Sequence, residues 1–137
     1  MNAEVKERLL DRVKTNPYVN HLGVQFTTVE DGIVEARMHL HDEQRQYSGV
    51  IHGGVLAALA DTIAGFAAYT MTPLDKDVLT AELKVSFLRA AWGKELIARG
   101  TVIKPGRHVH FSECEIYCDD KLVSKASGTF SVVQPQV

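Results

Sequence analysis

A single carboxylate lies in the most apolar part of the sequence. From Gln46 to Leu74, Asp61 is the only formally charged side chain, although 23% of all residues are charged. An ionisable carboxylate among apolar residues is costly unless it is paired or has a chemical task. Such a group can attack an electrophilic carbon or take a proton from water. We interpret Asp61 as a candidate nucleophile or general base, the alternative being an aspartate that only hydrogen-bonds to the backbone or caps a helix.

Two glycines precede Asp61 at the start of the same apolar segment, in the sequence His52, Gly53, Gly54. If a helix begins there, its first N–H groups lack partners within the helix and lie at the positive end of the helix dipole. Residues without a Cβ let a ligand approach these groups, which can then stabilise a developing oxyanion. The glycines could instead serve only as a turn into the helix. The acid that follows nine residues after His52 favours the oxyanion interpretation.

The apolar segment predicts one long helix from residue 53 to about residue 69, ending before Thr72 and Pro73. The positions that share a helical face with Asp61 are all small: Gly54, Ala57, Ala58, Gly65 and Ala68. The opposite stripe is bulky and suits packing on a sheet: Leu56, Leu59, Ile63 and Phe66. The small face allows a backbone or a ligand to approach the carboxylate. A membrane span is a poorer interpretation, because an Asp in mid-span costs about 2.5 to 3.5 kcal/mol.

The remaining segments predict one early helix and about six strands. Apolar residues at helical spacing indicate a helix over residues 1–14, which should end before Asn16 and Pro17, where the chain turns to strands. The expected strands cover residues 23–29, 33–40, 78–88, 95–104, 109–118 and 122–133. Strict alternation in the third strand gives one face to Leu79, Ala81, Leu83, Val85 and Phe87, opposite Thr80. We therefore expect an α+β fold in which an antiparallel sheet wraps around one long helix, as a single domain over residues 1–137.

The composition is that of an ordinary globular protein. Hydrophobic residues make up 45% of the chain and the net charge is −2, so no strong positive field favours nucleic acid as a partner. The N-terminal segment alternates acids and bases, unlike a signal or transit peptide, and we expect a cytoplasmic protein with no membrane attachment. Cys114 and Cys118 would lie about 13 Å apart along a strand, too far for a disulfide, and are expected to be reduced thiols.

Three segments resemble the hotdog-fold acyl-CoA thioesterases, especially the phenylacetyl-CoA and 4-hydroxybenzoyl-CoA branch. They are residues 49–55 (GVIHGGV), 60–62 (ADT) and 80–89 (TAELKVSFLR). The resemblance extends from about residue 20 to residue 133. It implies a hotdog fold that hydrolyses an aromatic or medium- to long-chain acyl-CoA to the free acid and coenzyme A. It also implies that no cofactor or metal is needed, and that the chain forms a homodimer, often paired again into a homotetramer.

The resemblance assigns roles to five positions. It implies that Asp61 is the nucleophile or the general base, without deciding between them, and that Gly53 N–H polarises the thioester carbonyl. His52 would brace the loop, and Gln46 matches a position where the family has Asn or Gln near the thioester. Thr80 matches a Ser or Thr that helps to place water. Strict alternation, however, points Thr80 away from a helix on the apolar face, although it could still line a site made with another subunit.

Basic residues near the expected strand ends are candidates for contacts with coenzyme A. They are Arg89, Lys104, Arg107 and His108, which could meet its phosphates at the rim of the site because guanidinium groups bind phosphate bidentately. Ordinary surface charge is the alternative. Gly54 is a further candidate for substrate binding. Four apolar or aromatic residues could line the acyl pocket: Tyr47, Phe66, Tyr69 and Met71.

Two histidine pairs could chelate a metal, because His39 and His41, like His108 and His110, are two residues apart on expected strands. A complete site needs a third ligand, which the sequence does not nominate. We therefore interpret these side chains as solvated strand histidines.

Two other functions fit the same segments. A hydratase or dehydratase on this fold needs a basic histidine positioned with an acid, and His52 could serve, although the two glycines after it favour a turn and an oxyanion site. A non-catalytic acyl-CoA sensor would not need the carboxylate of Asp61.

The spacing along the helix predicts a site shared by two chains. Gly53 and Asp61 are eight residues apart, which corresponds to about 12 Å along a helix. A thioester carbonyl must lie about 3 Å from both the oxyanion donor and the carboxylate, so these groups can be at most about 6 Å apart. One copy of the helix cannot meet that condition. A symmetric dimer with antiparallel helices brings Gly53 of one chain opposite Asp61 of the other.

Overall fold

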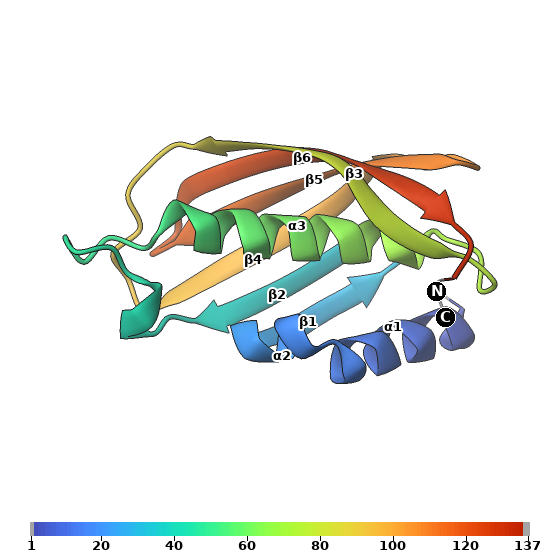
Figure 1. Cartoon of the computed structure of the whole chain (residues 1–137), viewed down its shortest axis with the longest axis horizontal. Coiled ribbons are helices and arrows are strands. Elements are labelled where there is room, and N and C mark those ends of the chain that lie inside the picture. Colours follow the sequence, from blue (N-terminus) through green and yellow to red (C-terminus); the bar gives the residue numbers. More distant parts are fainter. Residues whose placement is uncertain (1, 136–137) are drawn as a thin grey trace.

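Six antiparallel strands form one sheet that curves around helix α3 (Gly53–Thr70), as Figure 1 shows. The computed structural model describes residues 2–135. The strand order is β1-β2-β4-β5-β6-β3, which leaves β1 and β3 at the two edges. The strands are β1 (Val24–Glu30), β2 (Ile33–His39), β3 (Asp77–Phe87), β4 (Glu95–Lys104), β5 (Val109–Cys118) and β6 (Lys121–Val133). The predicted α+β architecture is therefore confirmed.

Helix α3 lies in the hollow of the sheet because its bulky stripe is apolar throughout. Leu56, Leu59 and Ile63 are buried, as predicted. The sheet approaches α3 closely at Gly100 of β4, where an added Cβ would lie 2.6 Å from the Ile63 carbonyl oxygen. Only glycine fits this contact. By length and composition α3 is the one helix among residues 2–135 that could cross a membrane, but in this fold its bulky stripe packs on the sheet.

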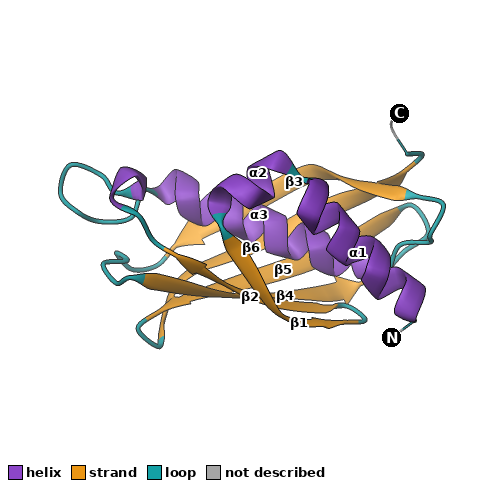
Figure 2. Ribbon diagram, turned by 90° about the horizontal axis from the view of Figure 1, so that it is seen from below, coloured by secondary structure: helices purple, strands orange, loops and turns teal. Residues whose placement is uncertain are grey.

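The N-terminal segment forms two helices where one was predicted. Helix α1 (Ala3–Thr15) ends before Asn16 as expected, but a short helix α2 (Pro17–Leu22) follows instead of a strand. The Asn16 side chain accepts a hydrogen bond from Val19 N–H at 3.2 Å, and Pro17 occupies a first helical position that needs no N–H donor. Gly23 ends α2 with φ of 74°. Figure 2 shows both helices on the side of the sheet that carries α3.

Arg8 fastens α1 to the end of α3. Its guanidinium donates to the carbonyl oxygens of Tyr69, Thr72 and Pro73 at 2.9, 2.8 and 2.7 Å. It also lies 4.0 Å from the centroid of the Tyr69 ring, within the range of a cation–π contact. Carbonyl groups at a helix C-terminus lack partners within the helix and carry the negative end of its dipole, so a guanidinium is well suited to this place.

A β-bulge interrupts β3 at Ala81. Thr80 is opposite Phe130 of β6 and Glu82 is opposite Thr129, so Ala81 has no partner of its own. A bulge adds one residue to one strand, and the inward and outward positions therefore exchange across it.

Because of the bulge, the side chains of β3 that face the core differ from those predicted. Leu83 and Val85, which follow it, pack against the core as expected. Before it, Val78 packs against the core instead, and Leu79 is 51% exposed. The prediction was wrong for Leu79 and also for Thr80, which lies on the face of Val78, toward α3.

Strand β5 buries a histidine and two cysteines. His110 is only 1% exposed, with Nε2 3.1 Å from Thr72 Oγ1, and its Nδ1 accepts a hydrogen bond from Gly106 N–H at 3.1 Å. The expectation of a solvated histidine was wrong here, and burial lowers the pKa of His110. Cys114 and Cys118 are free thiols, as predicted. Burial raises the pKa of Cys114 to about 12.

Candidate active site

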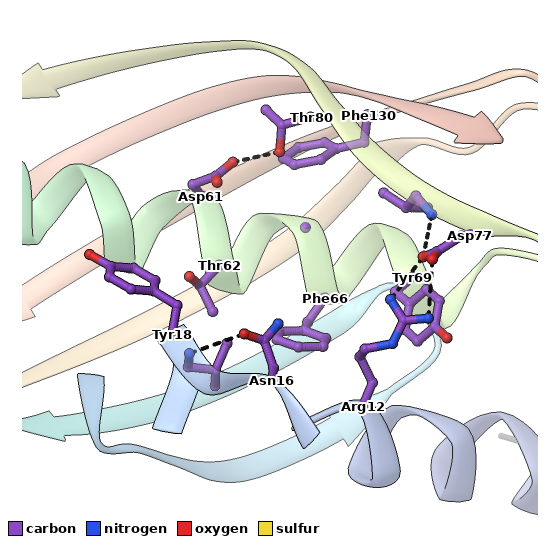
Figure 3. Close-up of a pocket in the computed structure, with 13 residues that line it drawn as sticks. Arg12, Asn16, Tyr18, Asp61, Thr62, Phe66, Tyr69, Asp77, Thr80 and Phe130 are labelled. Carbon is purple, nitrogen blue, oxygen red and sulfur yellow. Dashed lines mark hydrogen bonds and ion pairs between the residues drawn. The ribbon is translucent and has the colours of Figure 1, made fainter. Parts of the chain in front are cut away.

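Asp61 lies half-buried on the face of α3 that the sheet leaves uncovered, and Thr80 holds its carboxylate (Figure 3). The Thr80 hydroxyl donates a hydrogen bond of 2.7 Å to Asp61 Oδ1. The bulge at Ala81 makes this contact possible, because without it the alternation would direct Thr80 outward. Both residues were nominated from the sequence, but only the structure brings them together within one chain. A hydrogen bond to a carboxylate fixes its orientation, which a nucleophile or a general base requires.

The uncovered face of α3 consists mainly of small residues, as predicted. Gly54, Ala57, Ala58 and Gly65 are half-buried or exposed, whereas Ala68, expected in the same stripe, is completely buried. Small side chains leave the Asp61 carboxylate accessible from outside the protomer.

His52 caps the start of α3. Its Nδ1 accepts a hydrogen bond of 2.8 Å from Gly54 N–H. An added Cβ at Gly54 would lie 3.0 Å from this nitrogen, so the cap favours glycine there. Gly53 N–H, the first of the helix, makes no hydrogen bond within the described part of the chain. It is a free donor at the positive end of the helix dipole, with the Phe87 ring beside it.

Gln46 lies in the loop before α3. Its backbone closes a turn, in which Gln46 N–H donates to Val50 at 2.7 Å and its carbonyl accepts from Gly49 N–H at 2.9 Å. Its side chain is exposed. The predicted site residues therefore form two groups in one protomer: Gln46 precedes His52 and Gly53 at the start of α3, and Asp61 with Thr80 lies about two turns further along. The eight-residue spacing within one continuous helix is confirmed, so the separation of about 12 Å stands.

The four basic candidates lie at opposite ends of the protomer, and all are exposed. Arg89 follows β3 near the start of α3, where its N–H donates to the Val123 carbonyl at the beginning of β6. Lys104 ends β4, and Arg107 and His108 follow it in the loop near the end of α3. Because α3 has 18 residues, it is about 27 Å long, and one protomer does not bring Arg89 to the other three.

Neither histidine pair is joined by a third metal-ligating side chain in the described part of the chain. His39 and His41 lie with their ring centroids 5.6 Å apart, and both ring nitrogens of His110 are within hydrogen-bond distance of Thr72 and Gly106. Among residues 2–135, no group of three or more His, Cys, Asp or Glu side chains is arranged to hold a metal ion.

A pocket of about 300 Å³ extends from Asp61 toward the end of α3. We call it the acyl pocket, after the acyl group that we propose it binds. Helix α3 lines it with Thr62 and Gly65, strand β3 with Val78, and helices α1 and α2 with further side chains: Arg12, Asn16, Tyr18 and Val19. Of the four residues nominated to line such a pocket, Phe66 and Tyr69 do so. The other two do not line it: Tyr47 is fully exposed in the loop before α3, and Met71 follows the end of the helix.

Arg12 and Asp77 form an ion pair at the far end of the acyl pocket. The guanidinium donates two hydrogen bonds to the carboxylate, at 3.0 and 3.1 Å. Burial acts to raise the pKa of Asp77, but hydrogen bonds from Arg12 and from Val78 N–H outweigh it and hold the pKa below its ordinary value. The pair therefore stays ionised near neutral pH. Neither residue stands out in the sequence, because each is ordinary in its own segment and 65 positions separate them.

Together the sheet, the central helix and the helix-borne carboxylate define a hotdog-fold protein of the thioesterase type. The family model of the Thioesterase superfamily matches residues 48–125, which include α3 and the contact of Asp61 with Thr80. The chain belongs to this superfamily, and its reaction is the hydrolysis of a thioester.

Individual relatives agree with the family match. The proofreading thioesterase EntH of Klebsiella pneumoniae is 31% identical over 112 residues, which cover 82% of this chain and 81% of that protein. The crystal structure of a thioesterase family protein from Silicibacter pomeroyi has a TM-score of 0.92 at 27% identity, covering 96% of this chain and 99% of that one. A thioesterase from Haemophilus influenzae has a TM-score of 0.83 at 30% identity, covering 91% and 88% of the two chains.

Proposed function

We propose that this chain hydrolyses acyl-CoA thioesters at sites formed by Asp61 of one protomer and Gly53 of another. The observation that carries the proposal is the Asp61 carboxylate, which Thr80 holds at the mouth of the acyl pocket. A thioester carbonyl beside this carboxylate would direct its acyl group into the pocket. The resemblance to acyl-CoA thioesterases and the exposed basic side chains support coenzyme A as the thiol component, because guanidinium and ammonium groups bind phosphate.

The proposed reaction needs a nucleophile and an oxyanion donor. Asp61 either attacks the thioester carbon directly or takes a proton from a water that attacks it. A C–O bond forms, the carbonyl oxygen gains negative charge, and the free N–H of Gly53 stabilises that charge. The C–S bond then breaks and the coenzyme A thiolate leaves with the electron pair and takes up a proton. In the direct route, water subsequently hydrolyses the Asp61 anhydride.

A homodimer supports this chemistry better than a monomer. Strand β3 lies at the edge of the sheet, where its outer backbone groups are open to pairing with another strand. Two copies joined along β3 around a twofold axis would run their α3 helices antiparallel, with Gly53 opposite the partner's Asp61. The same arrangement brings the end that carries Arg89 toward the partner's end that carries Lys104 and Arg107. A homotetramer, which the resemblance also implies, adds nothing that this site requires.

We propose the cytoplasm as the compartment, because both cysteines are free thiols.

The state of His52 argues against a hydratase or dehydratase. Its Nδ1 accepts the Gly54 N–H, so the neutral ring carries its proton on Nε2 and keeps no free lone pair for a substrate proton. Acting as a general base would require His52 to release the cap of α3.

Replacing Asp61 by Asn tests the function. Asp61→Asn keeps the shape of the side chain and removes its charge, and kcat should fall at least about 100-fold. Release of coenzyme A from aryl and fatty acyl-CoA substrates is followed with a thiol reagent, with Asp75→Asn in the exposed loop before β3 as the matched control. Full activity in folded Asp61→Asn protein would refute the mechanism, and acyl-CoA binding without thiol release by the wild type would identify a sensor.

Mixed dimers test whether two chains share each site. Gly53→Pro removes the donor N–H at a position where a helix tolerates proline, and the half-exposed Phe87 ring beside it can turn aside. Neither Gly53→Pro nor Asp61→Asn homodimers should turn over substrate. In the heterodimer one site combines both defects and the other is intact, so about half of the wild-type activity should return. Inactive heterodimers from folded, dimeric parents would refute the shared site.

A further inference from the structure

Two residues separate the acyl pocket from a second cavity. A groove of about 410 Å³ runs along α1 on the far side of Arg12 and Tyr69, and both residues also line the acyl pocket. We call it the α1 groove; its other lining residues are Glu4, Glu7, Arg8, Asp11 and Thr15. Arg12 and Tyr69 thus form a partition between the site of Asp61 and a surface of the N-terminal helix.

Contacts with Asp77 and Arg8 fix the side chains of Arg12 and Tyr69 in the partition. Arg12 makes two hydrogen bonds to Asp77, whose side chain is 14% exposed, and its guanidinium lies 5.0 Å from the centroid of the Tyr69 ring. The guanidinium of Arg8 stands 4.0 Å from the same centroid. An apolar chain end that displaced Arg12 would leave the largely buried carboxylate of Asp77 without its partner, which is unfavourable.

The position of the partition limits the length of the acyl pocket. Tyr69 is eight residues beyond Asp61 on the same helix, so the partition stands about 12 Å from the carboxylate. The pocket offers apolar contacts to a hydrocarbon chain from Phe66, Val78 and Phe130, with Gly65 leaving room beside them. Its lining also includes polar side chains: Asn16, Tyr18 and Thr62. An extended acyl chain of about eight carbons measures roughly 11 Å from its carbonyl carbon to the outer edge of its terminal methyl, because each C–C bond of about 1.5 Å advances the chain by only roughly 1.3 Å. Such a chain ends just short of the partition.

We propose that the Arg12–Asp77 pair is the specificity-determining end of the acyl pocket and restricts substrates to acyl groups of about this length. The proposal rests on the proposed function. Shorter straight chains and single aryl rings end before the pair, whereas longer chains meet two charged groups that are already bound to each other. Selection by length therefore comes from the N-terminal helix, which lies outside the segment that matches the family model.

Removing Arg12 tests the proposal. Arg12→Ala opens the partition toward the α1 groove, and kcat/KM is measured over a straight-chain acyl-CoA series from butanoyl to hexadecanoyl. Wild type should be fastest near octanoyl-CoA. In the variant, the ratio of kcat/KM for dodecanoyl-CoA to that for octanoyl-CoA should rise about tenfold, the discrimination that hydrophobic pockets achieve for small differences in size.

Arg8→Ala is the matched control. It lies one turn away on α1 against the same Tyr69 ring, but it does not line the acyl pocket. It should lower the melting temperature through loss of its bonds to α3 and leave the optimal chain length unchanged. Arg12→Ala/Asp77→Asn is measured beside Arg12→Ala, because it opens the partition without leaving an unpaired carboxylate against a longer chain. It should show at least the same rise in the ratio, and it takes the place of Arg12→Ala if that variant fails to fold.

The outcomes separate this proposal from the proposed function. If wild type cleaves the acyl-CoA series and Arg12→Ala has the same optimal chain length, the role of the Arg12–Asp77 pair is overturned while the thioesterase function stands. The role of the pair is also overturned if the optimal chain length shifts as much in Arg8→Ala as in Arg12→Ala. If wild type cleaves no acyl-CoA, the proposed function fails, and calorimetric binding of non-hydrolysable S-alkyl-CoA thioethers decides the length limit. If affinity falls for alkyl groups longer than octyl in wild type but not in Arg12→Ala, the role of the ion pair is supported. If the two proteins show the same dependence on alkyl length, that role is overturned.

Discussion

Replacing Thr80 by Val should slow the reaction while leaving the fold intact. The two side chains have nearly the same shape, but Val cannot donate to the carboxylate of Asp61, from which the Thr80 hydroxyl is 2.7 Å distant. Thr80 is exposed in the protomer, so the substitution buries no unsatisfied group. What it removes is the contact that orients the attacking or water-activating carboxylate.

The magnitude follows from the charge on the acceptor. A hydrogen bond to an ionised group is worth about 1.5 to 3 kcal/mol, whereas bonds between neutral groups contribute about half as much. Loss of this bond in the transition state would lower kcat roughly 10- to 150-fold, since each 1.36 kcal/mol is a factor of ten. Because Asp61 is half-exposed in an isolated protomer, the decrease in kcat should there be near the lower limit of this range. It should be near the upper limit when a partner protomer covers the site. KM should change little, because Thr80 acts on the carboxylate.

Thr62→Val is the matched control for the assay. Thr62 lines the same pocket beside Asp61, but its hydroxyl donates to the Ala58 carbonyl within α3 at 2.7 Å. Thiol release from the best acyl-CoA substrate is measured for both variants, with the melting temperature as a check of folding. Thr62→Val should stay within a few-fold of wild type. A Thr80→Val enzyme no slower than Thr62→Val would refute the positioning role of Thr80.

Three further predictions concern the fold. The pKa of His110 is lowered in the folded chain, so as pH falls the imidazole of the unfolded chain takes up its proton first. The free energy of unfolding should therefore decrease as pH falls through about 6.5. Urea titrations at several pH values should show that this free energy depends less on pH in His110→Gln than in wild type. Gly100→Ala should cost about 1 to 3 kcal/mol in the same measurement, because its Cβ would press on the Ile63 carbonyl, and an unchanged urea midpoint would contradict the close contact. Cys114, with its pKa raised to about 12, should resist iodoacetamide in the native state at pH 8 and react only in urea, as mass spectrometry can follow.

Much of the fold and part of the site follow from local patterns in the sequence. An isolated charge in an apolar helix, two glycines where that helix begins, and alternating strands depend on interactions between near neighbours, which sequence spacing records directly. Asp61, Gly53 and His52 were nominated on these grounds, and the structure confirms the helix that carries them. The second short helix α2 also has local signals in Asn16 and Pro17, but the same two residues equally indicate the end of the first helix.

Tertiary structure alone decided which side chains meet. The bulge at Ala81 arises from the pairing of β3 with β6, and it turns Thr80 toward Asp61 against the strict alternation of the strand. Arg12 and Asp77 form the end of the acyl pocket although 65 positions separate them, because α1 packs across α3. Local propensity carries no information about such contacts, since their energy is gained only after distant segments have come together. The sequence by itself therefore determined the helix that carries the chemistry, and the packing of β3 and α1 against it determined the shape of the pocket.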